Sequence, residues 1–455
     1  MPHGHRQGHR MGSKYPPSMR GCLPLWTLVL EVALIVIFFF FTSSDTSSQD
    51  PKKLMANFRV LQDVTIMVAL GFGFLNSSLR RYGWSSVAFN LFLLALGVQW
   101  AVLMDGFLER PFRKKVVIKL SSIKLATMSA MSVVISAGAV LGKANLLQLT
   151  LMALVEVTVF VTMRMIDRQY LSMDNHVSMM HIHVFATYFG LMVAWFLSGC
   201  LNERVTEEKN QTAKSSSLFT MLGTLFLWIF WPSFNSALLD IPKERKNAVF
   251  NTYYALAAGA VTAISVSALA HPQGKINMTH IHNAVLAGGV AVGPSCHLIA
   301  SPWLAMLLGF MAGLISIWGA LCLPEYFNHV LGIHDTCGVH YTFGFPGLLG
   351  GITYILLIIY EVSWTKQSMI SYQLFIGIGT LSLAMASGLI AGVLTVSSFG
   401  YWILSKSIQE KQGLSENETT SFHCCPPFFV DDTLVTAKSP YIQWNKVRDE
   451  FGIKK

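Results

Sequence analysis

The sequence predicts an all-α fold, a polytopic membrane helical bundle of about 12 transmembrane spans. Of the 455 residues, 53% are hydrophobic and 13% are charged, whereas a soluble protein carries about a quarter charged residues. The mean hydropathy is +0.49. The apolar runs last about twenty residues, which is the length that a helix needs to cross a bilayer. Strands of a membrane barrel would instead alternate apolar and polar residues over about ten positions.

The expected spans follow one another along the chain. They are 23–42, 60–76, 86–107, 124–142, 146–165, 178–199, 218–239, 248–270, 280–299, 302–323, 340–361 and 372–404. Glycine and proline interrupt 340–350, and the last run is long enough to tilt or to extend beyond the bilayer. The membrane domain is therefore expected at 23–405, between a basic cytoplasmic N-terminal tail (1–22) and a cytoplasmic C-terminal tail (406–455).

The start of the chain resembles a signal peptide in one respect, because a basic segment precedes an apolar run. This run is longer than a typical signal core and lacks a small-x-small cleavage site, so an uncleaved first span is expected. Met11 is a second plausible start. An even number of spans places both termini on one side. Arg80, Lys143 and Lys275 favour the cytoplasm for that side, whereas the basic residues of 110–115 favour the reverse.

That orientation predicts an absence of glycans. The sequons lie at Asn76, Asn210, Asn277 and Asn417. All would be on the cytoplasmic side, and glycans are added only in the lumen.

The formal charge of +9 does not predict a nucleic-acid partner. The basic residues are scattered in short loops and both tails, where they flank helix ends and meet anionic lipid. The sequence shows no Ser-His-Asp pattern, P-loop or nucleotide fingerprint. We therefore expect no enzymatic activity, no catalytic residues and no cofactor.

Ionisable residues inside the spans are functional candidates, because a membrane makes them expensive. They are Glu31, Asp105, Glu156, His181, His183, His282, Asp335 and His340. Glu31 and Glu156 are expected to be neutral carboxyls that hydrogen-bond to a neighbouring helix, and Asp105 to be solvated or to cap a helix. His181 and His183 point about 200° apart on a helix, so only one can face a given cavity. His183 is either a pore residue or a buried structural hydrogen-bonding group.

The segment His334-Asp-Thr-Cys-Gly-Val-His340 places His, Cys and His at three-residue intervals. A structural zinc needs a fourth ligand and a closed tetrahedron, which His280 or His282 could supply only by a coincidence of folding. We therefore expect no metal site here. The small residues of 284–293 and 344–351 predict close helix packing or, alternatively, broken helices beside a substrate site.

Several motifs resemble the Rh branch of the ammonium transporters. They are LWIFWPSFNSA at 227–237, NTYY at 251–254, NAVLAGGVAVG at 283–293 and HDTCGVH at 334–340. The stretches 81–107 and 244–275 are similar to the erythroid D/CE type, and the resemblance covers nearly the whole chain from Met11. It implies a trimer of ammonium-transporter-like bundles, each with a narrow pore lined by two facing histidines and gated by phenylalanines.

The resemblance assigns pore roles by position. His183 matches the first pore histidine and Phe234 the inner gate phenylalanine, but the second pore histidine falls at Phe343 and the outer gate phenylalanine at Met128. Phe343 replaces a hydrogen-bonding ring by an apolar one, and Met128 lacks the quadrupole that attracts a cation.

Four polar residues are expected beside this pore. They are Asp335, which matches the family's acidic position, together with His340, Asp174 and Asn175. The family's aspartate before the first histidine falls at Asn175, with Asp174 one residue earlier, about 100° around the helix axis. Asp174 is also a candidate helix cap.

The resemblance implies two functions. The first is a poorly conducting subunit of an ammonia, ammonium or carbon dioxide transporting complex, assembled as a homotrimer or with a Rh-associated glycoprotein, and linked to the erythrocyte membrane skeleton through ankyrin. The alternative is an independently active ammonia channel in the plasma membrane. Cys22 and Cys322 are candidate palmitoylation sites, or else reduced, unmodified cytosolic thiols.

Overall fold

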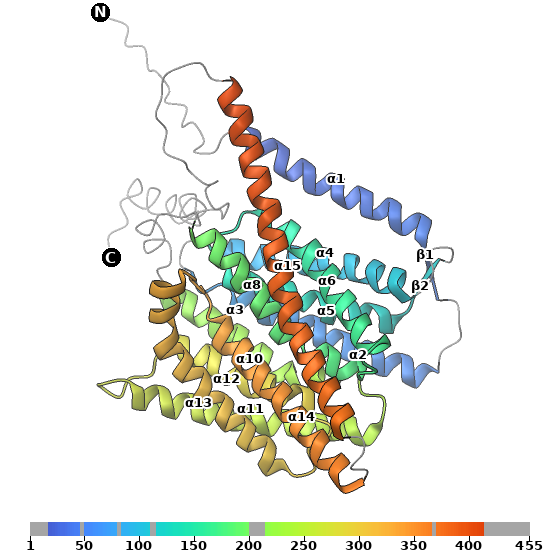
Figure 1. Ribbon diagram of the computed structural model, residues 1–455, viewed down its shortest axis with the longest axis vertical. Helices are drawn as coiled ribbons and strands as arrows, with labels where there is room; N and C mark the ends of the chain where they lie inside the picture. The colour runs from blue at the N-terminus through green and yellow to red at the C-terminus, as the bar shows by residue number, and fades with distance from the viewer. Residues whose placement is uncertain are drawn as a thin grey trace, which may run out of the picture.

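The computed structural model describes residues 17–45, 50–79, 83–109, 115–199, 214–365 and 370–413. Helices dominate these ranges (Figure 1). In the first half of the chain they are α1 (Pro17–Phe41), α2 (Pro51–Ile66), α3 (Gly73–Leu75), α4 (Gly83–Glu109), α5 (Leu120–Ala139), α6 (Leu146–Gln169), α7 (Asn175–Met180) and α8 (Ile182–Gly199). In the second half they are α10 (Lys214–Ser236), α11 (Pro242–Ala270), α12 (Met278–Val292), α13 (Pro302–Tyr326), α14 (Phe345–Thr365) and α15 (Ile370–Gly413).

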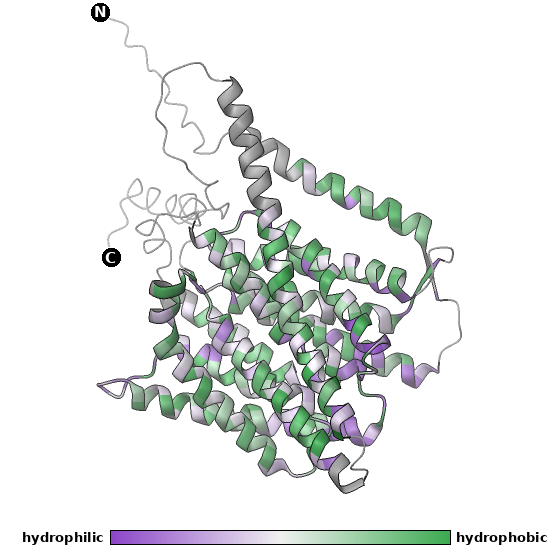
Figure 2. Ribbon diagram, viewed as in Figure 1, coloured by the Kyte–Doolittle hydropathy of each residue, from purple (hydrophilic) through white to green (hydrophobic). Residues whose placement is uncertain are grey.

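The expected membrane bundle is confirmed. Within the described ranges, 10 helical segments are long and apolar enough to cross a membrane. The described part of α1 is a shorter apolar helix, and α12 has only 15 residues. Together these segments correspond to the twelve expected spans. Figure 2 shows apolar residues along the helices and hydrophilic residues mostly at helix ends and connections.

Helix boundaries follow local capping chemistry. The span expected at 60–76 begins earlier, because Asp50 caps α2 and Pro51 occupies its first turn, where a missing N–H costs nothing. At the start of α6, Asn145 and Gln148 form a reciprocal capping box. At the other end of the chain, α15 continues as a helix to Gly413, beyond the expected end of the span.

Three π-helical turns interrupt the α-helices. They are η1 (Met67–Phe72), η3 (Phe327–Leu331) and η4 (His340–Gly344), and η2 (Gly293–Ser295) is a 3-10 turn. The chain also forms a short parallel ladder of β1 (Thr42–Ser44) with β2 (Val116–Ile118). Among the described residues, the helical bundle thus carries one two-stranded sheet, between the end of α1 and the start of α5.

Successive helices run in opposite directions, so the bundle has two ends. We call the end at which α1 begins and α15 finishes the termini face, and the end that carries β1 and β2 the strand face (Figure 1). Helix α1 lies along one edge, where most of its apolar residues are exposed and Leu34 is buried.

Small residues bring α11, α12 and α13 into close contact. A Cβ atom added at Gly288 would lie 2.4 Å from the Ala255 carbonyl oxygen, and one at Gly309 would lie 2.1 Å from the same atom. Gly350 of α14 approaches the Ala291 carbonyl in the same way, at 2.5 Å. The close packing expected from the small residues is therefore present.

Candidate functional site

His183 lies in a cage of aromatic rings at the centre of the bundle. The helix breaks at His181, and α8 then presents His183 with none of its surface exposed. Its ring is stacked on Trp231 at a centroid distance of 5.8 Å and on Phe343 at 6.0 Å, with Phe234 tilted against it at 6.1 Å. Neither ring nitrogen of His183 has a hydrogen-bond partner among the described residues. The aromatic rings therefore pack against the imidazole of His183 but form no hydrogen bond with it.

Phe343 reaches His183 from a π-helical turn. It belongs to η4, and its ring also lies 5.8 Å from that of Phe72, a residue of η1. Close approach of α14 to α8 depends on Gly347, because a Cβ there would meet the Cβ of His183 at 3.3 Å. The two positions expected to face each other across the pore are thus brought together, but as an imidazole against a phenyl ring.

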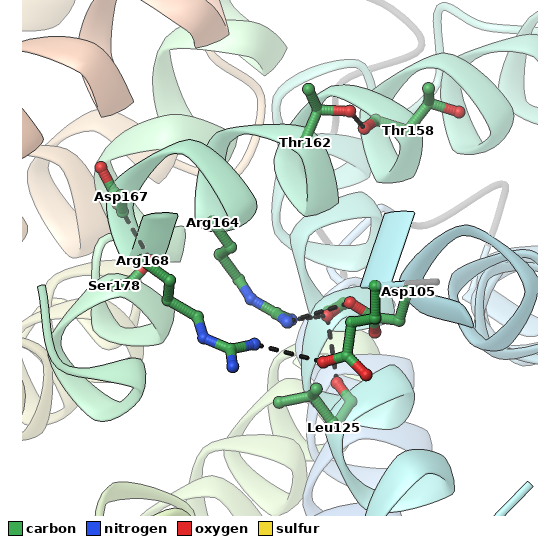
Figure 3. Close-up of polar contacts among 10 residues, drawn as sticks. Asp105, Leu125, Thr158, Thr162, Arg164, Asp167, Arg168 and Ser178 are labelled. Atoms are coloured by element: carbon green, nitrogen blue, oxygen red, sulfur yellow. Dashed lines mark hydrogen bonds and ion pairs between the residues drawn. The ribbon is translucent and has the colours of Figure 1, made fainter. Parts of the chain in front are cut away.

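Met128 and Phe234, the expected gate positions, are both fully buried. The neighbouring residue Ser129 accepts a hydrogen bond of 2.6 Å from Arg164. The same guanidinium forms an ion pair of 3.0 Å with Asp105 (Figure 3). This network joins α4, α5 and α6 beside Met128.

The expectation for Asp105 was wrong. Its side chain is 15% exposed and is paired with Arg164, so it is neither solvated nor a helix cap. The expectation that the two glutamates hydrogen-bond to a neighbouring helix is confirmed. The Ser136 hydroxyl of α5 donates to Glu156 on α6 at 2.5 Å, and Gln99 of α4 donates to Glu31 at 3.3 Å.

The polar residues before α7 are arranged differently from the expectation. Asp174 occupies the cap position, but its side chain makes no capping hydrogen bond. The side-chain oxygen of Asn175 is buried without a hydrogen-bond partner among the described residues. The Ser178 hydroxyl instead donates to the buried Asp167 at 2.9 Å. Sequence reasoning missed Asp167, which lies near the end of α6 and not in the expected motif.

A cavity of about 480 Å³ opens at the termini face. Its lining includes His282, Asn283, His334, Asp335 and His340. The cavity does not include His183, Trp231, Phe234 or Phe343 in its lining. The aromatic cage therefore lies outside this open space.

Asp335 organises the wall of this cavity. Its carboxylate accepts the backbone N–H of His340 at 2.9 Å. Lys143, in the connection after α5, donates to the carbonyl oxygen of His334. Burial lowers the pKa of Lys143 to about 8, although the nearby Asp335 carboxylate opposes this shift. Burial likewise raises the pKa of Asp335.

Of the two candidate palmitoylation cysteines, Cys322 has a described side chain. Cys322 is an exposed thiol near the end of α13, at the termini face. Cys22 falls in α1, but its side chain lies outside the described residues.

Comparison with known proteins assigns this arrangement to a family. Residues 25–423 match the model of the Ammonium Transporter Family. The chain is 63% identical to an RH-like protein of Macaca mulatta, over 85% of this chain and 92% of the relative. It is 60% identical, with the same coverage, to the blood group Rh(CE) and Rh(D) polypeptides of Homo sapiens.

Solved structures agree on the fold. The Rh50 protein of Nitrosomonas europaea, described as one of the Rhesus protein family of channels, superposes with a TM-score of 0.66 at 27% identity. It covers 89% of this chain and 100% of the Rh50 chain. Mep2 of Saccharomyces cerevisiae superposes with a TM-score of 0.60 at 17% identity, over 77% of this chain and 90% of its own.

The family match covers α5, α8, α10 and α14, and the relatives at about 60% identity carry Rh names. The chain therefore belongs to the ammonium transporter family and is similar to the Rh blood-group polypeptides.

Proposed function

We propose that this chain is a poorly conducting subunit of a Rh complex that transports ammonia or ammonium across the plasma membrane. The observation that carries the proposal is the stacking of Phe343 on His183 at 6.0 Å, within 16° of parallel. Trp231 stacks on His183 as well, and both nitrogens of the imidazole lack partners among the described residues. A species that enters this cage meets one imidazole, two phenyl rings and the indole of Trp231, whose Nε1–H also lacks a partner among the described residues.

The physical chemistry of the substrate explains the consequence. Burying a bare ammonium ion in a dry pore costs tens of kcal/mol on a Born estimate, so the species that crosses must be neutral ammonia. Ammonia is both a donor and an acceptor, and it can pass between two imidazoles that exchange hydrogen bonds with it. With Phe343 in place of the second imidazole, ammonia would lose the hydrogen bonds on that side of His183.

The alternative is an independently active channel for ammonia or another neutral gas such as carbon dioxide. It is favoured by the retained His183 and by the cavity of about 480 Å³ at the termini face, which could admit a substrate to the bundle. The two functions differ in a measurable way, because only the alternative requires flux through this chain alone.

The test is stopped-flow ammonia uptake by liposomes that contain the purified chain. We expect uptake no faster than that of empty liposomes. Phe343→His should raise it about tenfold or more, since each 1.4 kcal/mol removed from a barrier is a factor of ten. Phe343→Leu is the matched control, because it removes the ring without adding a donor or an acceptor.

Each outcome has a defined meaning. If Phe343→Leu raises the ammonia flux as much as Phe343→His does, the bulk of the phenyl ring closes the pore, and the loss of a hydrogen-bonding partner does not. Loss of the gained flux in Phe343→His/His183→Ala would place the path between these two residues. Rapid uptake by the unaltered chain that disappears in His183→Ala would overturn the proposal in favour of the independent channel.

The proposed assembly is a homotrimer, or a heterotrimer with a Rh-associated glycoprotein, with a skeletal link through ankyrin. Large apolar residues exposed on α11 and α13, including Phe250, Tyr253, Trp303 and Trp318, offer surface for such contacts. We further propose cytoplasmic termini and palmitoylation of Cys22 and Cys322. Co-purification of the glycoprotein with this chain, lost when exposed α13 residues are changed to alanine, would support the heterotrimer.

A further inference from the structure

A cluster of three metal-ligating side chains lies at the strand face, away from the histidine motif considered in the sequence. His176 comes from α7, whereas Cys296 and His297 follow η2, the turn that ends α12. One ligand atom of each residue lies within 4.8 Å of the other two. The segments that supply them are more than a hundred positions apart in the chain, so the fold itself creates the cluster.

The distances fit a tetrahedral ion. Cys296 Sγ lies 3.6 Å from His176 Nε2. Zinc binds sulfur at about 2.3 Å and imidazole nitrogen at about 2.0–2.1 Å, so tetrahedral geometry separates the two ligands by about 3.6 Å. The rings of His176 and His297 are 5.1 Å apart and nearly perpendicular, at 86°, so the two imidazoles contact each other edge to face while one ligand atom of each lies within 4.8 Å of Cys296 Sγ.

The cluster is buried and only partly satisfied. Cys296 is 0%, His176 1% and His297 9% exposed. Nδ1 of each histidine is buried without a hydrogen-bond partner among the described residues. The polar contacts of the cluster include those of His176 Nε2 with Cys296 Sγ at 3.6 Å and with the Gly293 carbonyl at 3.0 Å, and that of Cys296 Sγ with the Asn235 carbonyl at 3.8 Å. Buried polar atoms without partners are rare and indicate a missing ligand or a functional role.

Charge also favours a cation here. The carboxylate of Asp174 lies close enough to His297 to interact with it electrostatically, and Asp174 is exposed. It therefore supplies a negative charge beside the cluster. A water molecule or this carboxylate can complete the coordination, since three protein ligands leave a fourth position open.

We propose that His176, Cys296 and His297 form a zinc site at the strand face. One thiolate with two imidazoles is a donor set that suits Zn²⁺, whereas hard cations such as Mg²⁺ and Ca²⁺ prefer oxygen. Binding through Nε2 of His176 replaces its contact with Gly293, and the thiol of Cys296 releases its proton to solvent.

The site would tie α7 to the connection between α12 and α13. Both segments lie next to the aromatic cage. Helix α7 directly precedes α8, which carries His183, and Cys296 contacts the carbonyl of Asn235, the residue after Phe234. A bound ion would therefore hold the strand-face end of two pore helices in place without entering the pore. This inference does not depend on whether the pore conducts.

The experiment uses the full-length chain purified in detergent, stripped with a chelator and dialysed against Zn²⁺ or Co²⁺. We expect about one ion per chain, a thiolate-to-metal absorption band with Co²⁺, and a higher thermal midpoint with Zn²⁺ because the ion binds the folded state. Cys296→Ser and His297→Gln should weaken binding about tenfold or more. Cys322→Ser, which alters an exposed thiol elsewhere, is the matched control.

Two results would overturn the proposal. One is unchanged Zn²⁺ affinity in Cys296→Ser and His297→Gln, which would mean adventitious metal. The other is the absence of the thiolate-to-Co²⁺ absorption band in the unaltered chain. This second test does not require any variant to fold. Loss of binding in Cys337→Ser, but not in Cys296→Ser, would move the site to the histidine motif at the termini face.

Discussion

At position 343, a single side chain changes what the centre of the bundle can offer to a polar molecule. The phenyl ring fills the space opposite His183 and leaves both imidazole nitrogens without partners among the described residues. A buried polar atom left unpaired costs about 1–3 kcal/mol. The unpaired imidazole is therefore energetically costly, and we expect a hydrogen-bonding residue at position 343 to relieve this cost.

The ion pair between Arg164 and Asp105 gives a prediction about stability. The side chains are 2% and 15% exposed. We expect Arg164→Met to lower the free energy of unfolding by about 3–5 kcal/mol, because it leaves the Asp105 carboxylate buried and uncompensated. The measurement is the thermal unfolding of the detergent-purified variant, followed by tryptophan fluorescence.

The chain contains its own control for this substitution. Arg168 pairs with Glu109 on the same two helices, but these side chains are 43% and 56% exposed. Arg168→Met should therefore cost only about 0–1 kcal/mol. Equal losses in the two variants would show that burial does not decide the effect. Partial recovery is expected in Arg164→Met/Asp105→Leu, which removes both charges.

Sequence reasoning identified the expected pore positions His183 and Phe343, which do meet in the bundle, but it did not identify the polar network between Arg164 and Asp105. His183, Phe343, Phe234 and Met128 lie in local motifs, so a resemblance could place them. Arg164 meets Asp105 across 59 positions of sequence, and nothing in either local pattern specifies the partner. Such pairs follow from the rotation of packed helices about their axes, which apolar periodicity does not define.

At the scale of elements, the contact between α11, α12 and α13 depends on the absence of side chains. We predict that Gly309→Ala lowers stability by about 1–3 kcal/mol through overpacking, because its Cβ would lie 2.1 Å from the Ala255 carbonyl oxygen. Neither partner is a flexible side chain that could move aside. The thermal midpoint of the purified protein would record the loss.

Gly379 of α15 is the matched control. Its added Cβ would meet only the Cδ1 of Leu171, at 3.9 Å, which is ordinary van der Waals contact. Gly379→Ala should be neutral or stabilising, since alanine is favoured over glycine in a helix by about 0.8–1.0 kcal/mol. A Gly309→Ala midpoint no lower than that of Gly379→Ala would contradict the proposed packing.

The elements themselves were largely predictable. Apolar runs of membrane length gave all the spans, because a bilayer imposes that length on a helix. The pairing of Thr42–Ser44 with Val116–Ile118 was not predictable, since three-residue segments carry no periodicity and meet only after the helices between them have packed. The π turns were likewise invisible, because one extra residue in a helical turn leaves the composition unchanged.

For the whole molecule, orientation in the membrane can be tested at one sequon. Asn277 is exposed at the termini face and caps α12 by accepting the Thr279 N–H at 3.0 Å. Asn76 is buried and donates to Asn90 and to the Val134 carbonyl, so it is closed to modification in the folded chain. Asn210 and Asn417 lie outside the described residues.

We predict that the protein from a glycosylating host shows no mobility shift on glycosidase treatment, because the proposed orientation puts the termini face in the cytoplasm and glycans are added only in the lumen. A shift that disappears in Asn277→Gln would instead place the termini face, and with it the cavity, on the outside of the cell. The charge pattern favours the first result, since Lys143 and Lys275 both lie at this face.

The π turns also determine where the chain can lose a residue while the helical bundle is kept. The turn His340–Gly344 holds one residue more than an α turn needs. Deleting one residue there would restore an α turn and rotate the preceding segment by about 100° relative to α14. A different side chain would then face His183. A deletion of one codon in this turn would therefore change the residues around His183, while the membrane spans keep their lengths.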